Sequence, residues 1–125
     1  MRDEAAYARQ YRQLNPEKTQ AATARWREKN PLFFKDKHLR RKFGISLDDW
    51  MFLFLSTQKS RCACCGSIEP HDKFGWHVDH DHEKKRGDVG FVRGILCGPC
   101  NRMLGAARDD IKRLTDAILY LGKFK

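Results

Sequence analysis

Two short cysteine motifs decide how this chain folds. Residues 62–66 read Cys-Ala-Cys-Cys-Gly, and residues 97–100 read Cys-Gly-Pro-Cys. They contain two C-x2-C units, separated by 31 residues: Cys62 with Cys65, and Cys97 with Cys100. Each short turn brings two sulfurs to one side of an ion, so the motifs predict one tetrahedral, structural Zn²⁺ per chain. Four unligated buried cysteines would leave the repeated spacing unexplained.

Cys64 is the odd cysteine of the five. Pairing Cys62 with Cys65 keeps the two-residue gap and places Gly66 directly after the second ligand, where a tight turn favours glycine. We therefore expect Cys64 to be a bystander. The alternative is that it replaces a neighbouring ligand.

A cluster of histidines and carboxylates lies between the cysteine motifs, where residues 77–82 read His-Val-Asp-His-Asp-His. On a regular strand Asp79 and His80 would face opposite sides, so a bend is needed to bring both to one phosphate. Residues 91–96 predict a second strand, which makes a β-hairpin with a long basic loop. A helix from about residue 97 to 108 follows, so the predicted unit is a ββα element with zinc at its base.

Residues 92–101 read Val-Arg-Gly-Ile-Leu-Cys-Gly-Pro-Cys-Asn. Together with residues 77–82, this segment resembles the phage recombination endonuclease VII family, within the His-Asn-His (ββα-metal) nucleases. The resemblance is strong over about residues 61–108 and loose outside them. It implies an α+β fold with a zinc-stapled ββα-metal core and mostly helical flanks. It also implies Mg²⁺-dependent hydrolysis of DNA phosphodiester bonds, on branched or junction DNA.

The resemblance also assigns roles by position. It makes His80 the general base and makes Asp79 and Asn101 the Mg²⁺ ligands, with Mn²⁺ expected to substitute for Mg²⁺. It gives supporting contacts to the phosphate or leaving group to His77 and His82. The chain departs from the family pattern at Leu104, where an acidic metal-site residue can follow the asparagine by three positions.

The chemistry of these side chains agrees with the roles. Histidine, with an ordinary pKa near 6.5, can take a proton from water at neutral pH. Mg²⁺ prefers oxygen ligands such as a carboxylate and an amide. Two alternatives for the histidines are a second zinc site and a purely structural hydrogen-bonded cluster. Arg93 on the second strand is a candidate phosphate clamp, or else an ordinary exposed arginine.

Composition points to a polyanionic partner. The chain has 125 residues, a net charge of +9 and a mean hydropathy of −0.71. Its longest apolar run, residues 50–55, is far short of the ~20 residues that span a bilayer, so no membrane partner is expected. Residues 1–4 show no apolar signal segment. We therefore expect a cytoplasmic location, in the host cell if the protein is phage-encoded, and reduced cysteines.

The basic charge lies mainly in the first half, because residues 1–61 hold 14 Lys/Arg against 7 Asp/Glu. We predict a basic helical arm over residues 1–44 and a zinc-bound endonuclease domain over 45–125. Asn-Pro pairs at 15–16 and 30–31 suggest helices at about 3–14, 16–29 and 31–43, each Asn capping the helix that follows. The arm either binds DNA phosphates or is a solvated, frayed extension. The predicted DNA-binding residues are Arg40, Arg41, Lys42, Lys84, Lys85, Arg86 and Arg93.

Two apolar helices complete the prediction. One runs from a capping-box pair at Ser46 and Asp49 to about residue 58, and its surplus of apolar residues is covered either by the arm or by a second copy in a homodimer. The other, at about 109–121, is expected to close the core. Two other functions stay open: a sequence-preferring nicking or double-strand endonuclease of the same chemistry, and a non-catalytic zinc module that binds DNA.

Overall fold

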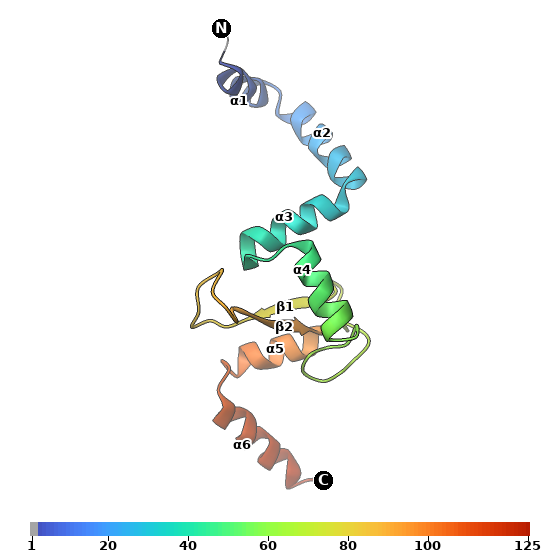
Figure 1. Cartoon of the computed structure of the whole chain (residues 1–125), viewed down its shortest axis with the longest axis vertical. Helices are drawn as coiled ribbons and strands as arrows, with labels where there is room; N and C mark the ends of the chain where they lie inside the picture. The colour runs from blue at the N-terminus through green and yellow to red at the C-terminus, as the bar shows by residue number, and fades with distance from the viewer. Residues whose placement is uncertain (1–2) are drawn as a thin grey trace. The chain divides into compact units, whose positions relative to one another are not determined.

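The computed structural model describes residues 3–125 and combines many helices with one small sheet (Figure 1), which confirms the predicted mixture of helix and strand. The chain divides into two compact units between His38 and Leu39. This division falls inside the third helix rather than at residue 44. The assignment of arm and nuclease domain by function stays a prediction.

The first unit contains α1 (Glu4–Leu14), α2 (Pro16–Lys29) and the start of α3 (Pro31–Phe43), close to the predicted bounds. The prediction that each Asn caps the following helix is wrong for Asn15, whose side chain makes no such bond. The amide groups of Asn15 and Asn30 instead donate to the carbonyls of Tyr11 and Trp26, at 3.0 and 2.9 Å. Each therefore closes the preceding helix, while the proline that follows starts the next one.

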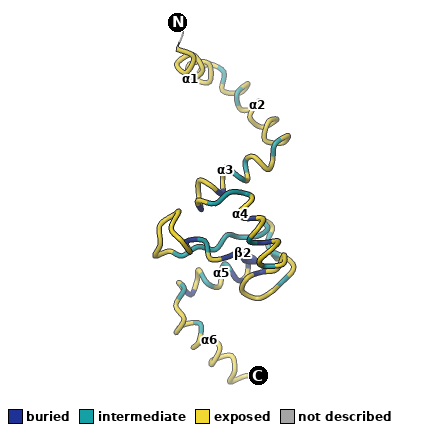
Figure 2. Tube along the Cα trace, in the orientation of Figure 1, coloured by how far each residue is buried: buried dark blue, intermediate teal, exposed yellow. Residues whose placement is uncertain are grey.

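Neither α1 nor α2 buries a residue, and both are almost wholly exposed in Figure 2. Trp26 packs edge-on against Phe33 and Phe34, with ring centroids 4.8 and 5.3 Å apart, yet remains 45% exposed. Without a buried apolar face, these helices depend on caps and local pairs for their stability.

The core of the second unit is built around α3, α4 (Leu47–Met51) and the strands. Ser46 and Asp49 form the predicted capping box. The single predicted helix to residue 58 is wrong in its second half, because Phe52–Thr57 form a π-helix, labelled η1. The wider turn changes which side chains face inward. The buried core side chains are Leu39, Phe43, Trp50, Phe54, Phe91 and Ile95.

The sheet pairs β1 (His77–His80) with β2 (Val92–Leu96) in antiparallel register. The register shifts between Asp79 and His80, because the pairing skips Arg93 of β2 and leaves a β-bulge where a bend was expected. The Gln58 side chain pairs with both backbone groups of Ile95, donating at 2.9 Å and accepting at 2.9 Å. This fastens the end of η1 to β2.

Two helices follow the sheet: α5 (Gly98–Ala106), which packs on β1, and α6 (Ile111–Gly122). Asp110 caps α6 by accepting a hydrogen bond from the Arg113 backbone. The expectation that this helix closes the core is wrong, because α6 buries no residue and Ile111 and Ile118 are 79% and 70% exposed. Within residues 3–125 no helix is long and apolar enough to cross a membrane.

Candidate metal centre and active site

The four predicted zinc ligands come together. The sulfur atoms of Cys62, Cys65, Cys97 and Cys100 all lie within 4.8 Å of one another, and those of Cys65 and Cys97 are 3.7 Å apart. A tetrahedral ion with metal–sulfur bonds of about 2.3 Å needs sulfurs separated by roughly 3.8 Å. The predicted pairing is therefore confirmed as a donor set for one metal ion, and four sulfurs suit zinc.

Short backbone turns position the cluster. The Cys62 amide donates to Ser67, and the Gly66 amide returns to the Cys62 carbonyl at 2.9 Å. Gly66 has a φ of +75°, which glycine adopts at little cost. On the other side, Cys97 precedes α5 and its amide donates to the Cys62 sulfur at 3.3 Å. The two knuckles thus hold the start of α5.

Ionisation of the cluster favours a bound cation. Burial opposes a thiolate at Cys62, but donors from the backbone of Cys65 and Cys97 outweigh it and lower its pKa to about 6. Burial and the neighbouring thiols raise the pKa of Cys100. Without a cation, four thiolates in this space would repel one another, and a divalent ion removes that penalty. The donor chemistry therefore fits zinc.

Cys64 lies outside the set of four, and its side chain is exposed. This agrees with its predicted role as a bystander.

Asp79 on β1 forms the strongest ion pair near the bulge. The Arg93 guanidinium donates to both of its carboxylate oxygens, at 2.7 and 2.8 Å. The same guanidinium reaches Asp109, at 3.2 and 3.3 Å. Asp79 and Arg93 are thus brought together, and Asp109 joins them. No local pattern in the sequence indicated this contact, because Asp109 lies 16 residues from Arg93.

His80, on the other side of the bulge, has an apolar environment. Its ring lies 5.7 Å from Phe43 and 5.1 Å from Phe91, and 4.5 Å from the ring of His82. Burial and the nearby His82 lower the pKa of His80 below its ordinary value, with Asp79 acting in the opposite direction. Two adjacent residues of β1 therefore have different surroundings, as expected for neighbours on a strand: ionic for Asp79, aromatic for His80.

His77 does not join His80. Its Nε2 atom lies 3.0 Å from Asp72, whose side chain is only 7% exposed and also accepts from Arg102 at 2.7 Å. Hydrogen bonds from the Phe74 amide and from His77 hold the pKa of Asp72 at about 2. No pattern in the sequence indicated a role for Asp72, because its partner Arg102 is 30 residues away and its five-residue spacing from His77 matches no regular element.

Asn101 is half-buried in α5, the helix that follows the second knuckle and packs on β1. Gly98 at the start of this helix allows a close approach, because a Cβ there would lie 2.5 Å from the Asp72 carboxylate. The Gly98 amide donates to Pro70 at 2.8 Å. The cysteine cluster and the Asp72 loop together fix the end of α5 that carries Asn101.

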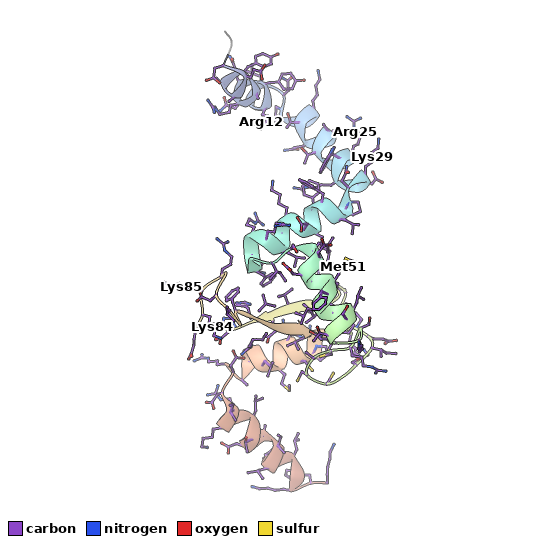
Figure 3. The ribbon with its side chains drawn as sticks, in the orientation of Figure 1. Arg12, Arg25, Lys29, Met51, Lys84 and Lys85 are labelled. Atoms are coloured by element: carbon purple, nitrogen blue, oxygen red, sulfur yellow. The ribbon has the colours of Figure 1, made fainter. Side chains whose placement is uncertain are left out.

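Two of the predicted basic segments meet at the hairpin. The loop after β1 carries Lys84 and Lys85, which Figure 3 labels. The Arg86 side chain in the same loop donates to the Arg41 carbonyl at the end of α3. Two predicted DNA-binding segments, 40–42 and 84–86, therefore lie together, although 41 and 86 are far apart in sequence.

A cavity of about 560 Å³ opens beside Arg93. His82 and Asp109 line it, and so does Leu104, which adds no charge to its wall. Its other lining residues are Asp81, Glu83, Gly105 and Arg108.

The chain is similar to known proteins. The sequence pattern of the recombination endonuclease VII family matches residues 36–123. The chain is 39% identical to the Gene 59 protein of Mycobacterium phage D29 over 82 residues, 65% of this chain and 46% of the relative. It is also 39% identical to the Gene 59 protein of Mycobacterium phage L5 over 80 residues, 63% of this chain and 44% of the relative.

The chain thus spans less than half the length of the curated relatives it matches. No solved structure matches it significantly. The family pattern covers well over half of the chain, including both cysteine pairs, the two strands and α5. On this match, the chain belongs to the recombination endonuclease VII family.

Proposed function

We propose that this chain is a metal-dependent endonuclease that hydrolyses phosphodiester bonds of DNA. In this proposal β1, β2 and α5 act as a ββα-metal core. The observation that carries it is the bulge between Asp79 and His80, next to a helix that the cysteine cluster holds in place. A bulge re-aims side chains and is common beside active sites.

The zinc site is structural in this proposal. One Zn²⁺ per chain binds the four cysteines and positions Asn101, the residue directly after Cys100. A closed set of four protein ligands leaves no open position on zinc for water or substrate. The hydrolytic chemistry must therefore lie elsewhere.

His80 is the proposed general base. Its apolar surroundings disfavour the charged imidazolium, so the ring stays neutral at pH 7 and can accept a proton from water. His82, whose ring contacts that of His80, is the proposed contact for the phosphate or the leaving oxygen. His77 acts indirectly, because its bond to Asp72 ties the start of β1 to α5.

Asp79 and Asn101 supply the oxygen atoms that would hold Mg²⁺, or Mn²⁺ in its place. Such a cation, when bound, offsets the negative charge that develops on the phosphate. A carboxylate and an amide suit this ion, which keeps several of its waters. Neither residue is a ligand of the cysteine cluster, so the two metal sites are separate.

The basic cluster at residues 40–42 and 84–86 would contact DNA phosphates on either side of the cleaved bond. We propose branched or junction DNA as the substrate, in keeping with the family, and a homodimer as the form that cuts both strands. The host-cell cytoplasm is the proposed place of action.

The test is cleavage by the purified, zinc-loaded protein. Supercoiled plasmid, linear duplex and a four-way junction are incubated with Mg²⁺, with Mn²⁺ and with a chelator. Cleavage that requires the divalent ion and favours the junction supports the proposal. Cleavage at defined duplex sites would indicate a sequence-preferring endonuclease. Binding to all three substrates without cleavage would indicate a zinc module without catalytic activity.

A further inference from the structure

Arg93 lies between two carboxylates and contacts both. Its Nε and one terminal nitrogen bind the two oxygens of Asp79, while its terminal nitrogens also reach the two oxygens of Asp109. The side chains of Asp79 and Asp109 are 13% and 29% exposed, and that of Arg93 is 34% exposed. The pairs are therefore only partly screened by water.

The Arg93 guanidinium is hydrogen-bonded to the Asp79 carboxylate, which is the group proposed to bind a divalent cation. Two like charges on one half-buried carboxylate repel each other, so Arg93 and the cation compete for Asp79. A guanidinium moved off Asp79 needs another partner, because a partly buried charge left unpaired is costly. Asp109 already contacts it.

The backbone at the end of α5 is shaped to place Asp109. Arg108 and Asp109 both have positive φ values, 54° and 56°. Side-chain-bearing residues adopt this region rarely, and two in a row are more unusual still. The Asp109 amide closes this turn on the Leu104 carbonyl at 3.0 Å. The turn thus places a carboxylate in the cavity wall next to the uncharged Leu104.

We infer that Asp109 is a positioning residue that retains Arg93 when a divalent cation takes Asp79. The inference rests on the proposed function, because it takes Asp79 as a metal ligand. With the cation absent, Arg93 bridges both carboxylates. With the cation bound, Arg93 stays on Asp109 at the mouth of the cavity, and its freed N–H groups face the DNA phosphate. Asp109 acts through Arg93 and does not ligate the metal.

The role of Asp109 is tested by measuring the affinity of the whole zinc-loaded chain for Mn²⁺ in the absence of DNA. Electron paramagnetic resonance gives this affinity, because its spectrum reports the free Mn²⁺. Arg93→Gln removes the competitor and should tighten Mn²⁺ binding roughly tenfold, the size of a charge-assisted hydrogen-bonded pair. Asp109→Asn leaves Arg93 with Asp79 alone and should weaken binding several-fold. In the double variant the Asp109 substitution should have no further effect, so its affinity should match that of Arg93→Gln.

Two controls separate this from the simple effect of charge. Arg113→Gln and Asp116→Asn make the same charge changes on α6 and should leave Mn²⁺ affinity unchanged. If Asp109 acted only through its charge, or ligated the metal directly, Asp109→Asn would weaken Mn²⁺ binding by the same factor with and without Arg93. Such an additive result would overturn the inference. An equal affinity of wild type and Asp109→Asn would also overturn it.

Asp79→Asn distinguishes failure of the inference from failure of the proposed function. If this variant binds Mn²⁺ as well as wild type does, Asp79 is not a metal ligand, and both the proposed metal site and the inference fall. If Asp79→Asn loses Mn²⁺ binding while the substitutions at Arg93 and Asp109 have additive effects, the proposed metal site stands. Only the role of Asp109 is then wrong.

Discussion

Asp79 and His80 are adjacent residues of β1 that differ sharply in their surroundings. At the register shift between them, Asp79 is paired with Arg93, the β2 residue that the strand pairing skips, while His80 lies among aromatic rings. An ionised carboxylate needs polar partners, whereas a base that works at neutral pH benefits from surroundings that disfavour its charged form. Because successive side chains of a strand point to opposite faces, neighbours in sequence can meet both requirements.

His80→Ala should abolish DNA cleavage and leave binding close to wild type. A general base acts in the transition state and adds little to ground-state affinity, and its loss should slow cleavage by about 10²–10⁴-fold. Plasmid nicking and gel-shift titrations measure the two effects separately. Undiminished cleavage would move the base to another residue, with His82 tested next.

The pH dependence of cleavage should follow the lowered pKa of His80. The neutral ring is the active form, so the rate rises with pH through that pKa and levels off above it. Because burial and His82 lower the pKa, the midpoint of the rise should lie below the ordinary histidine value near 6.5. His82→Gln removes one lowering influence and should move the midpoint to higher pH. A midpoint above the ordinary value in the wild type would contradict this environment.

Gly98→Ala should destabilise the fold. The added Cβ would lie 2.5 and 2.6 Å from side-chain atoms of Asp72, so the loop or the helix must move. Overpacking of this kind costs about 1–3 kcal/mol of unfolding free energy. Gly105→Ala in the same helix meets nothing within 4 Å and should raise stability by up to about 1 kcal/mol, as alanine favours helix. Thermal melts of both variants are the measurement, and equal melting temperatures would contradict the close packing at Gly98.

At the scale of elements, the cysteine cluster joins segments that could not hold each other by apolar contact alone. Its knuckles link the turn at residues 62–66 to the start of α5, beside a core of few buried side chains. Small domains often need such a metal site.

Cys97→Ser should therefore remove the bound zinc and unfold the second unit. Structural zinc contributes on the order of 10 kcal/mol, more than a small domain can lose. Metal analysis and circular dichroism of the variant test this. Cys64→Ser is the matched control, because Cys64 lies outside the set of four, and it should keep both zinc and fold. A cooperative melt of a zinc-free wild-type sample would contradict a structural role for the metal.

The helix α3 shows how one element serves two parts of the chain. Its last turns bury Leu39 and Phe43 in the core of the second unit, while Arg40, Arg41 and Lys42 stay exposed. A truncation that tests the preceding helices must therefore keep α3 whole.

At the scale of the whole molecule, deletion of residues 1–29 should weaken DNA binding and flatten its salt dependence. This segment holds seven Lys/Arg against four Asp/Glu, buries no described residue, and carries Arg12, Arg25 and Lys29 on its exposed helices (Figure 3). Each lost phosphate contact should lower the slope of log affinity against log salt by roughly 0.9 on duplex DNA. Cleavage at low salt should persist, since every proposed ligand and catalytic residue lies beyond residue 29.

Circular dichroism first shows whether the truncated protein is folded. DNA-binding isotherms at several salt concentrations then measure the slope of affinity against salt. An unchanged slope would mean that α1 and α2 are a solvated extension. An unfolded or aggregated product would mean that the rest of the chain needs these helices to fold.

Features that depend on local spacing could be predicted from the sequence. The cysteine pairs, the capping box at Ser46 and the proline-started helices rest on residues a few positions apart, so their geometry is nearly independent of the rest of the chain. The family motif also lies in a short stretch, and its match confirms the recognition. The register shift between Asp79 and His80 lies where a bend was expected, while the convergence of both side chains on one phosphate stays a prediction.

Features that depend on partners distant in sequence were decided by the tertiary structure alone. The bond from Gln58 to Ile95, the ion pair of Arg102 with Asp72 and the bridge from Arg93 to Asp109 join residues that have no shared local pattern. The exposure of α6 also could not be predicted from the sequence. Its apolar stripe at helical spacing predicts a buried face, but burial requires a partner surface, and no apolar pattern within one helix specifies where that surface is.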